Sequence, residues 1–157
     1  MRRFPLIALG CLLALAACGQ PAPSPPPPAQ PSAPAPSTEA RQTAIAALPA
    51  PYNEANYEAG RRVFAQCRAC HTLDAGAGNR VGPNLHLVFG REIGTAPGFT
   101  YSPAALAGDF TWDAERLDQW LANPQGFLPG NRMAFVGVRE PTQRRDVIAY
   151  LMVETAE

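Results

Sequence analysis

The stretch Cys67-Arg68-Ala69-Cys70-His71 decides how the rest of the chain is interpreted. Two thiols separated by two residues and followed at once by a histidine form the attachment pattern of a c-type haem. Tyr57, Gly60 and Phe64 precede the motif at helical spacing, so the pattern predicts that it ends a helix. A helical turn there places both sulfurs along one edge of a porphyrin, where they add to the two vinyl groups, and puts the imidazole of His71 under the iron.

Three other interpretations of the two thiols compete with haem attachment. A redox-active dithiol usually follows a strand in a βα unit, whereas this motif follows a predicted helix. A structural zinc site needs four ligands, and the chain outside its first 17 residues offers few candidates: Cys18, Cys67, Cys70, His71 and His86. A structural disulfide that closes a two-residue loop stabilises little. Covalent haem attachment is the favoured interpretation.

A low-spin haem electron carrier needs a second axial ligand besides His71. The candidates are His86, Met133 and Met152. Met152 lies between Leu151 and Val153 in a predicted helix, which favours a role in the core. His86 lies in a loop and could bind iron, although a loop histidine more often packs or donates a hydrogen bond. Met133 lies in a non-helical, Pro- and Gly-containing loop that can approach the distal face, and it is favoured over His86.

Length, composition and charge exclude several classes of protein. The chain has 157 residues, enough for one compact domain, and its 13 basic residues, all arginine, balance 13 acidic ones. A net charge near zero argues against a general nucleic-acid binder and against an acidic disordered chain. No apolar run reaches the length of a membrane span, which argues against a polytopic membrane protein.

The first 50 residues indicate export and tethering. Residues 1–17 combine two arginines with a short apolar run, as in a secretory signal, and the small residues before Cys18 resemble the lipobox of bacterial lipoproteins. The alternative is an ordinary signal that leaves Cys18 as a free thiol. Residues 18–50, with nine prolines between Pro21 and Pro36, predict a lipidated cysteine and an extended tether. A proline-rich ligand for a recognition domain is the other interpretation of this segment.

Residues 51–157 hold nearly all the aromatic side chains and form the only predicted folded domain. Its periodicity predicts an all-α domain: a helix before Cys67, a short helix after Ser102, a helix that begins near Thr111–Asp113 and ends at Asn123-Pro124, and a C-terminal helix after Pro141. Between Thr72 and Tyr101 there is almost no periodicity. Such a long loop in a compact domain needs something to organise it, and the predicted haem would do so.

From about residue 56 to residue 157 the chain resembles mitochondrial-type class I cytochromes c. The matching motifs are Cys67-x-x-Cys70-His71-Thr72, Val81-Gly82-Pro83-Asn84-Leu85-His86, Phe89-Gly90-Arg91, Ala96-Pro97-Gly98-Phe99-Thr100-Tyr101-Ser102, Thr111-Trp112, Asn123-Pro124, Pro129-Gly130-x-x-Met133-x-Phe135 and Ile148-Ala149-Tyr150-Leu151. The resemblance implies a class I cytochrome c fold, with three to five helices and long loops wrapped around one covalently bound haem c.

The resemblance also implies roles for individual residues. Cys67 and Cys70 would form the thioethers, with His71 as proximal ligand and Met133 as distal ligand. The Pro83 carbonyl would accept a hydrogen bond from the ring of His71. The remaining predicted contacts with the haem are those of the propionate partners and of the packing residues: Arg91, Tyr101, Trp112, Trp120 and Phe135.

Two features depart from the family pattern. Trp120 replaces the tyrosine whose hydroxyl contacts the methionine sulfur in many relatives. The ring of docking lysines is absent, because the chain has no lysine. A smaller set of arginines is predicted to dock partners instead: Arg62, Arg68, Arg80, Arg132 and Arg139. The alternative is that these arginines are ordinary solvated surface residues.

These features together predict a membrane-tethered, single-haem electron carrier and not an enzyme. We expect it on the periplasmic side of a bacterial membrane, as a monomer, with no nucleic acid and no small-molecule substrate. Its expected partners are redox complexes of a respiratory or photosynthetic chain, such as a quinol-oxidising cytochrome bc complex and a terminal oxidase. Two other functions remain open, a haem peroxidase and a haem-based gas sensor, and both require a labile sixth ligand.

Overall fold

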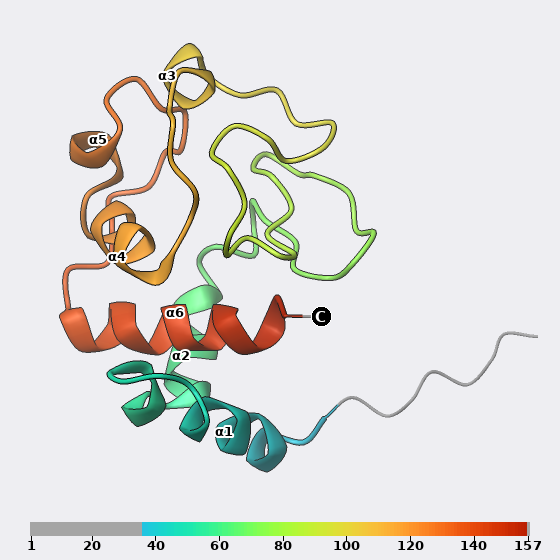
Figure 1. Cartoon of the computed structure of the whole chain (residues 1–157), viewed down its shortest axis with the longest axis vertical. Coiled ribbons are helices and arrows are strands. Elements are labelled where there is room, and N and C mark those ends of the chain that lie inside the picture. The colour runs from blue at the N-terminus through green and yellow to red at the C-terminus, as the bar shows by residue number, and fades with distance from the viewer. Residues whose placement is uncertain (1–35, 157) are drawn as a thin grey trace, which may run out of the picture. The chain divides into compact units, whose positions relative to one another are not determined.

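The structure, a computed structural model, describes residues 36–156 and consists of helices joined by long loops (Figure 1). Its elements in chain order are α1 (Thr38–Ala46), the 3-10 helix η1 (Tyr52–Glu54), α2 (Tyr57–Phe64), α3 (Pro103–Leu106), α4 (Ala114–Ala122), α5 (Pro124–Phe127) and α6 (Pro141–Glu154). The all-α prediction is confirmed. Within these residues there are more helices than the three to five expected. The prediction did not include α1, and the short helices α3 and α5 each add a single turn.

The crossing of α2 with α6 organises the core, and Gly60 makes it possible. A Cβ atom built on Gly60 would lie 2.7 Å from the Cβ of Tyr150, and it would also collide with the Asp146 carbonyl oxygen. The Phe64 ring, one turn further along α2, lies 5.3 Å from the Tyr150 ring. Only glycine lets the two backbones approach this closely, and Figure 1 shows α6 lying across α2.

Side-chain caps mark where five of the helices of residues 36–156 begin. At α2, the Asn56 side chain accepts a hydrogen bond from the Ala59 amide at 2.8 Å. The caps of α1, α3, α4 and α5 are Ser37, Ser102, Asp113 and Asn123, of which the sequence predicted Ser102 as a cap. A cap satisfies an amide at the helix N-terminus that no carbonyl of the helix can reach.

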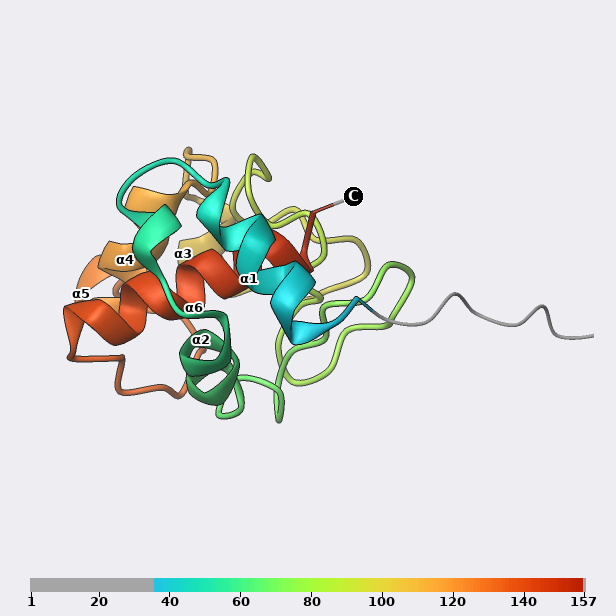
Figure 2. The ribbon, with the colours of Figure 1, turned by 90° about the horizontal axis from the view of Figure 1, so that it is seen from below.

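The folded domain begins before residue 51, which was the predicted boundary, because α1 packs against the core of the domain (Figure 2). Ile45 is fully buried. Arg41 forms an ion pair with Glu154 of α6, with 2.7 Å between Nε and Oε1. The Gln42 side chain accepts a hydrogen bond from the Tyr57 amide at 2.8 Å and donates one to a nearby carbonyl. The Pro-, Ala-, Ser- and Gln-rich composition of residues 18–50 predicts a tether without a core, which is wrong for residues 38–46.

The predicted signal at residues 1–17, the predicted lipidation site Cys18 and the proline-rich segment up to residue 35 lie outside the described residues. In the part of the chain that is described, no helix is both long and apolar enough to cross a membrane.

Backbone pairing organises part of the long loop region. Beside an antiparallel bridge between Glu92 and Thr111, the Trp112 amide donates to the Arg91 carbonyl at 2.8 Å. The Gly90 amide donates to the Trp112 carbonyl at 2.7 Å. These bonds bring Arg91 and Trp112, two of the predicted site residues, side by side.

Candidate functional site

The motif Cys67–His71 lies in a tight turn that directly follows α2. The amides of Cys70 and His71 both donate to the Cys67 carbonyl, at 3.0 and 2.9 Å. Both cysteines are partly buried and neither is in a disulfide. Burial raises the pKa of the Cys67 thiol to about 11, and repulsion from the nearby Cys70 sulfur adds a smaller part of this shift. The Cys67 thiol is therefore protonated at neutral pH.

The imidazole of His71 is oriented by the loop that follows it. Its Nδ1 lies 2.7 Å from the Pro83 carbonyl oxygen. A carbonyl only accepts, so Nδ1 carries the proton and the lone pair of Nε2 is left to bind a metal. Burial lowers the pKa of His71, although the bond to Pro83 opposes this, and the nearby Arg91 lowers it further. The ring is therefore held neutral, as a metal ligand must be.

Gly82 lets the loop pass directly against this imidazole. A Cβ atom at position 82 would lie 2.8 Å from both ring nitrogens of His71. The Gly82 amide donates to the Cys70 carbonyl at 2.8 Å, which fastens the loop to the cysteine turn. The motif and the following loop therefore form one unit.

Met133 lies in the segment between α5 and α6, where burial alternates along the chain. Asn131, Met133 and Phe135 are partly buried, whereas Arg132 and Ala134 between them are exposed. The Met133 side chain is therefore partly removed from solvent, unlike those of its two neighbours. Met152 is different, because it lies in α6 and packs against the core cluster, as its predicted role in the core required.

Arg91 is half-buried and its guanidinium contacts only carbonyl oxygens. It donates to Asn84 at 3.0 Å and to His86 at 3.4 Å. Burial lowers its pKa, and the neighbouring Tyr101 opposes this shift. Within residues 36–156 no carboxylate pairs with it. A half-buried cation without a carboxylate suits an anionic group such as a haem propionate.

The other predicted haem contacts lie in aromatic clusters. Trp112 and Trp120 meet edge to face with ring centroids 5.6 Å apart, and Phe127 packs against both. Tyr101 lies edge to face against a neighbouring phenylalanine, and its hydroxyl accepts a hydrogen bond from the Ala96 amide at 3.3 Å. Phe135 is partly buried against the core cluster.

The donor set fits one covalently bound haem c. Cys67 and Cys70 offer reduced thiols at the spacing that thioether formation requires. His71 is neutral and oriented, and Met133 offers a partly buried thioether on another loop. In the described part of the chain no three His, Cys, Asp or Glu side chains gather as they would around a zinc ion.

The arginines of the described residues fall into separate groups. The five predicted docking arginines are exposed and form no ion pair within residues 36–156: Arg62, Arg68, Arg80, Arg132 and Arg139. Five others are paired with acidic side chains: Arg41, Arg61, Arg116, Arg144 and Arg145. The Arg80 guanidinium donates to the Arg68 carbonyl at 2.8 Å, which brings two of the unpaired arginines together.

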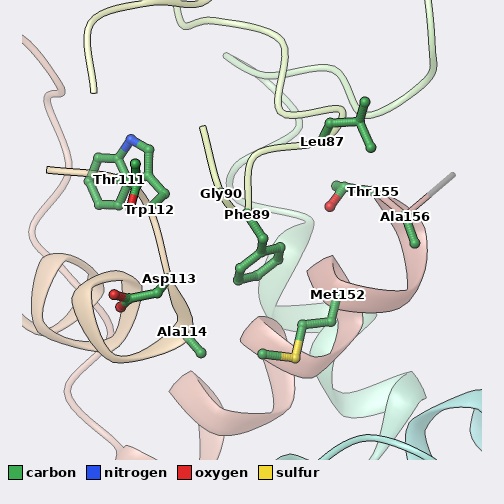
Figure 3. A pocket seen from close by; sticks show the side chains of 10 residues that line it. All are labelled: Leu87, Phe89, Gly90, Thr111, Trp112, Asp113, Ala114, Met152, Thr155 and Ala156. Carbon is green, nitrogen blue, oxygen red and sulfur yellow. The ribbon is translucent and has the colours of Figure 1, made fainter. Parts of the chain in front are cut away.

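A cavity of about 430 Å³ lies beside this site (Figure 3). It is bounded by the loop around Phe89, by the segment from Thr111 to Ala114 and by the end of α6 at Met152. Trp112 is the only predicted site residue in its wall, and neither His71 nor Met133 lines it. The cavity is therefore separate from the predicted iron ligands.

Sequence reasoning assigned no role to three residues of the site. Gly82 makes room for His71, and the side chains of Asn84 and Asn131 each tie together a loop through several hydrogen bonds. An asparagine two residues before a loop amide is the usual pattern of an Asx turn. The turn propensity of asparagine in the loops around Asn84 and Asn131 is therefore a sequence pattern from which these two turns could have been predicted.

The chain is similar to curated proteins named cytochrome c. It is 39% identical over 106 residues to the protein of Kluyveromyces lactis, covering 67% of this chain and 96% of that one. It is 40% identical over 111 residues to the protein of Sesamum indicum, covering 68% of this chain and all of that one. The solved structure of cytochrome cH from Methylobacterium extorquens matches with a TM-score of 0.57 and 41% identity, covering 61% of this chain and 96% of that one. No protein-family model matches the chain.

Proposed function

The chain belongs to the class I cytochrome c family and is a haem electron carrier, and from this premise we propose that it works as a membrane-tethered carrier between redox complexes. The family carries one covalently attached haem c and is not enzymatic. The observation that supports the haem site best is the neutral His71, oriented by Pro83 directly after two free thiols.

The chain's residues would hold the haem from both sides. Cys67 and Cys70 would be the thioether residues, His71 the proximal ligand and Met133 the distal ligand. When bound, the haem iron supplies a one-electron change between ferric and ferrous states. A thioether from Met133 favours a higher reduction potential than a second imidazole would. Arg91, Tyr101 and Trp112 would neutralise or hydrogen-bond the propionates.

We propose that Cys18 is acylated and that the proline-rich segment is a tether on the periplasmic side of a bacterial membrane. Proline-rich chains extend by about 3 Å per residue, so about 20 residues between the anchor and α1 would reach on the order of 60 Å. A tether of this kind supplies a high effective concentration near membrane partners. The donor would be a quinol-oxidising cytochrome bc complex and the acceptor a terminal oxidase or a similar complex.

Partner docking would rest on the five unpaired arginines and not on net charge. The chain from Cys18 onward has 11 arginines and 13 acidic residues, a formal charge of −2. The paired arginines are neutralised locally, so the exposed positive charge is concentrated in the unpaired set. Exposed charges act mainly on the rate of encounter, and salt screens them over about 8–10 Å.

Electron transfer by isolated membranes of the producing bacterium tests the tether and the docking residues together. The full chain is compared with a soluble form that begins at residue 36 and so keeps α1, across a series of salt concentrations. We expect the soluble form to transfer electrons more slowly and with a steeper salt dependence. Equal rates and equal salt slopes would contradict the tether.

A pair of variants tests the docking residues. In the soluble form, Arg132→Gln should lower the transfer rate at low salt by about two- to fivefold, because a steering charge is lost. Arg116→Gln is the control, since Arg116 is already paired with Asp113. If both variants behave alike, the unpaired arginines are ordinary surface residues.

Acylation is tested by labelling cells with a radioactive fatty acid. We expect the wild-type chain to carry the label and Cys18→Ser to lack it. An unlabelled wild type would contradict the lipid anchor and leave an ordinary exported protein.

A further inference from the structure

The side chain of Asn131 joins the Met133 segment to α5. Its Oδ1 accepts a hydrogen bond from the Met133 amide at 2.8 Å. Its Nδ2 donates to the carbonyl oxygens of Pro124 and Leu128, at 2.9 and 2.8 Å. Both amide hydrogens are therefore used. Gln125 adds an outer layer, because its Nε2 lies 3.2 Å from the Met133 carbonyl oxygen and 3.4 Å from the Asn131 Oδ1.

Few other bonds hold this part of the chain. Gly130 has a φ of +86° and marks a sharp turn, after which no helix forms until α6. The backbone bonds of the segment are those of the Asn131 amide to Leu128 and of the Phe135 amide to Met133, at 3.1 and 2.9 Å. Neither connects Met133 to α5. The Asn131 side chain supplies most of that connection, and the Gln125 bond to the Met133 carbonyl supplies the rest.

We propose that Asn131 is a positioning residue that keeps the Met133 thioether on the iron, an inference that rests on the ligand assignment of the proposed function. A thioether is a weak ligand in water, so it holds a metal site only when the chain restricts it to the right place. That restriction acts as a high effective concentration. Without the Asn131 side chain, the Met133 backbone is joined to α5 only by the exposed and longer bond from Gln125, so external ligands compete with the thioether more easily.

Gln42 offers a matched control away from the site. Its side chain accepts a hydrogen bond from the Tyr57 amide at 2.8 Å and donates one to the Ala55 carbonyl oxygen at 3.0 Å. Gln42 thus joins two segments through side-chain bonds to the backbone, as Asn131 does. Gln42→Ala removes two hydrogen bonds without touching the Met133 segment.

The test is a titration of the ferric holo-protein with imidazole, in which the loss of the methionine–iron charge-transfer band measures binding. We expect Asn131→Ala to bind imidazole about tenfold more tightly than wild type. This corresponds to about 1.4 kcal/mol, which one or two hydrogen bonds can supply. Gln42→Ala should stay within about twofold of wild type. Native-state hydrogen exchange of the Met133 amide should be faster in Asn131→Ala only.

Three outcomes would overturn the inference. The first is an imidazole affinity of Asn131→Ala within twofold of wild type. The second is an equal gain in Gln42→Ala at an equal loss of global stability, which would indicate a general structural effect. The third, a wild type with no methionine–iron band, would refute the ligand assignment itself and is recognised before any variant is made. If Asn131→Ala does not mature, Asn131→Asp and Gln125→Ala carry the test, with smaller gains expected from each.

Discussion

Replacing Ile45 by alanine should lower the free energy of unfolding of the holo-protein by about 2–3 kcal/mol. The change removes three carbon atoms from a fully buried side chain, which is worth about 0.8 kcal/mol for each in lost transfer free energy. A residual cavity would add to this, and Ile→Ala changes in cores cost about 2–5 kcal/mol. We place the value at the lower end, because α1 lies at the edge of the core and can partly collapse onto the space.

Guanidinium chloride unfolding of the oxidised holo-protein measures this change. Thr43→Ala is the control, since Thr43 lies in the same helix, is exposed and bonds only within α1. It should change stability by less than about 0.5 kcal/mol. If Ile45→Ala is equally mild, α1 does not dock in solution. The folded domain would then begin near residue 51, as the composition of the segment suggested.

Three further changes test other parts of the structure. Gly82→Ala should disturb the His71 imidazole, because the new methyl group would lie within 2.8 Å of both ring nitrogens. We expect a redox titration to give a shifted midpoint potential, and an unchanged midpoint potential would contradict the close contact. Tyr57→Phe should cost about 1 kcal/mol at pH 7 through a lost hydrogen bond. Burial and an adjacent carboxylate raise the pKa of Tyr57, so the wild type loses stability as the pH rises above about 10. The difference in free energy of unfolding between wild type and Tyr57→Phe should therefore narrow above this pH. If that difference stays constant from pH 7 to 11, the pKa of Tyr57 is not raised. Changing Cys67 and Cys70 together to serine should abolish haem staining after denaturing electrophoresis, and a persistent stain would contradict the thioether bonds.

The helices that carry the site could be predicted because their signals are local. The cysteine motif, the apolar spacing of α2 and α6 and the caps at Ser102 and Asp113 each depend on residues close together in the sequence. The resemblance to a known family then supplied the fold that joins them. The helical content and the family are both confirmed.

The parts that sequence reasoning missed depend on contacts between distant residues. α1 has one large apolar side chain, and its attachment comes from Arg41 and Gln42 reaching residues far along the chain. The loops around Asn84 and Asn131 are held by side-chain bonds to backbone atoms, which leave no periodic pattern in the sequence. The turn propensity of asparagine indicated where these loops bend but not which carbonyls they would meet.

The most direct test of the central assignment, a haem held between His71 and Met133, is the spectrum of the ferric protein with and without Met133. The wild type should show the methionine–iron charge-transfer band. Met133→Ala should keep its haem through denaturing electrophoresis but lose that band and its low-spin spectrum. A Met133→Ala spectrum that matches the wild type would contradict the assignment and make His86 or another group the sixth ligand.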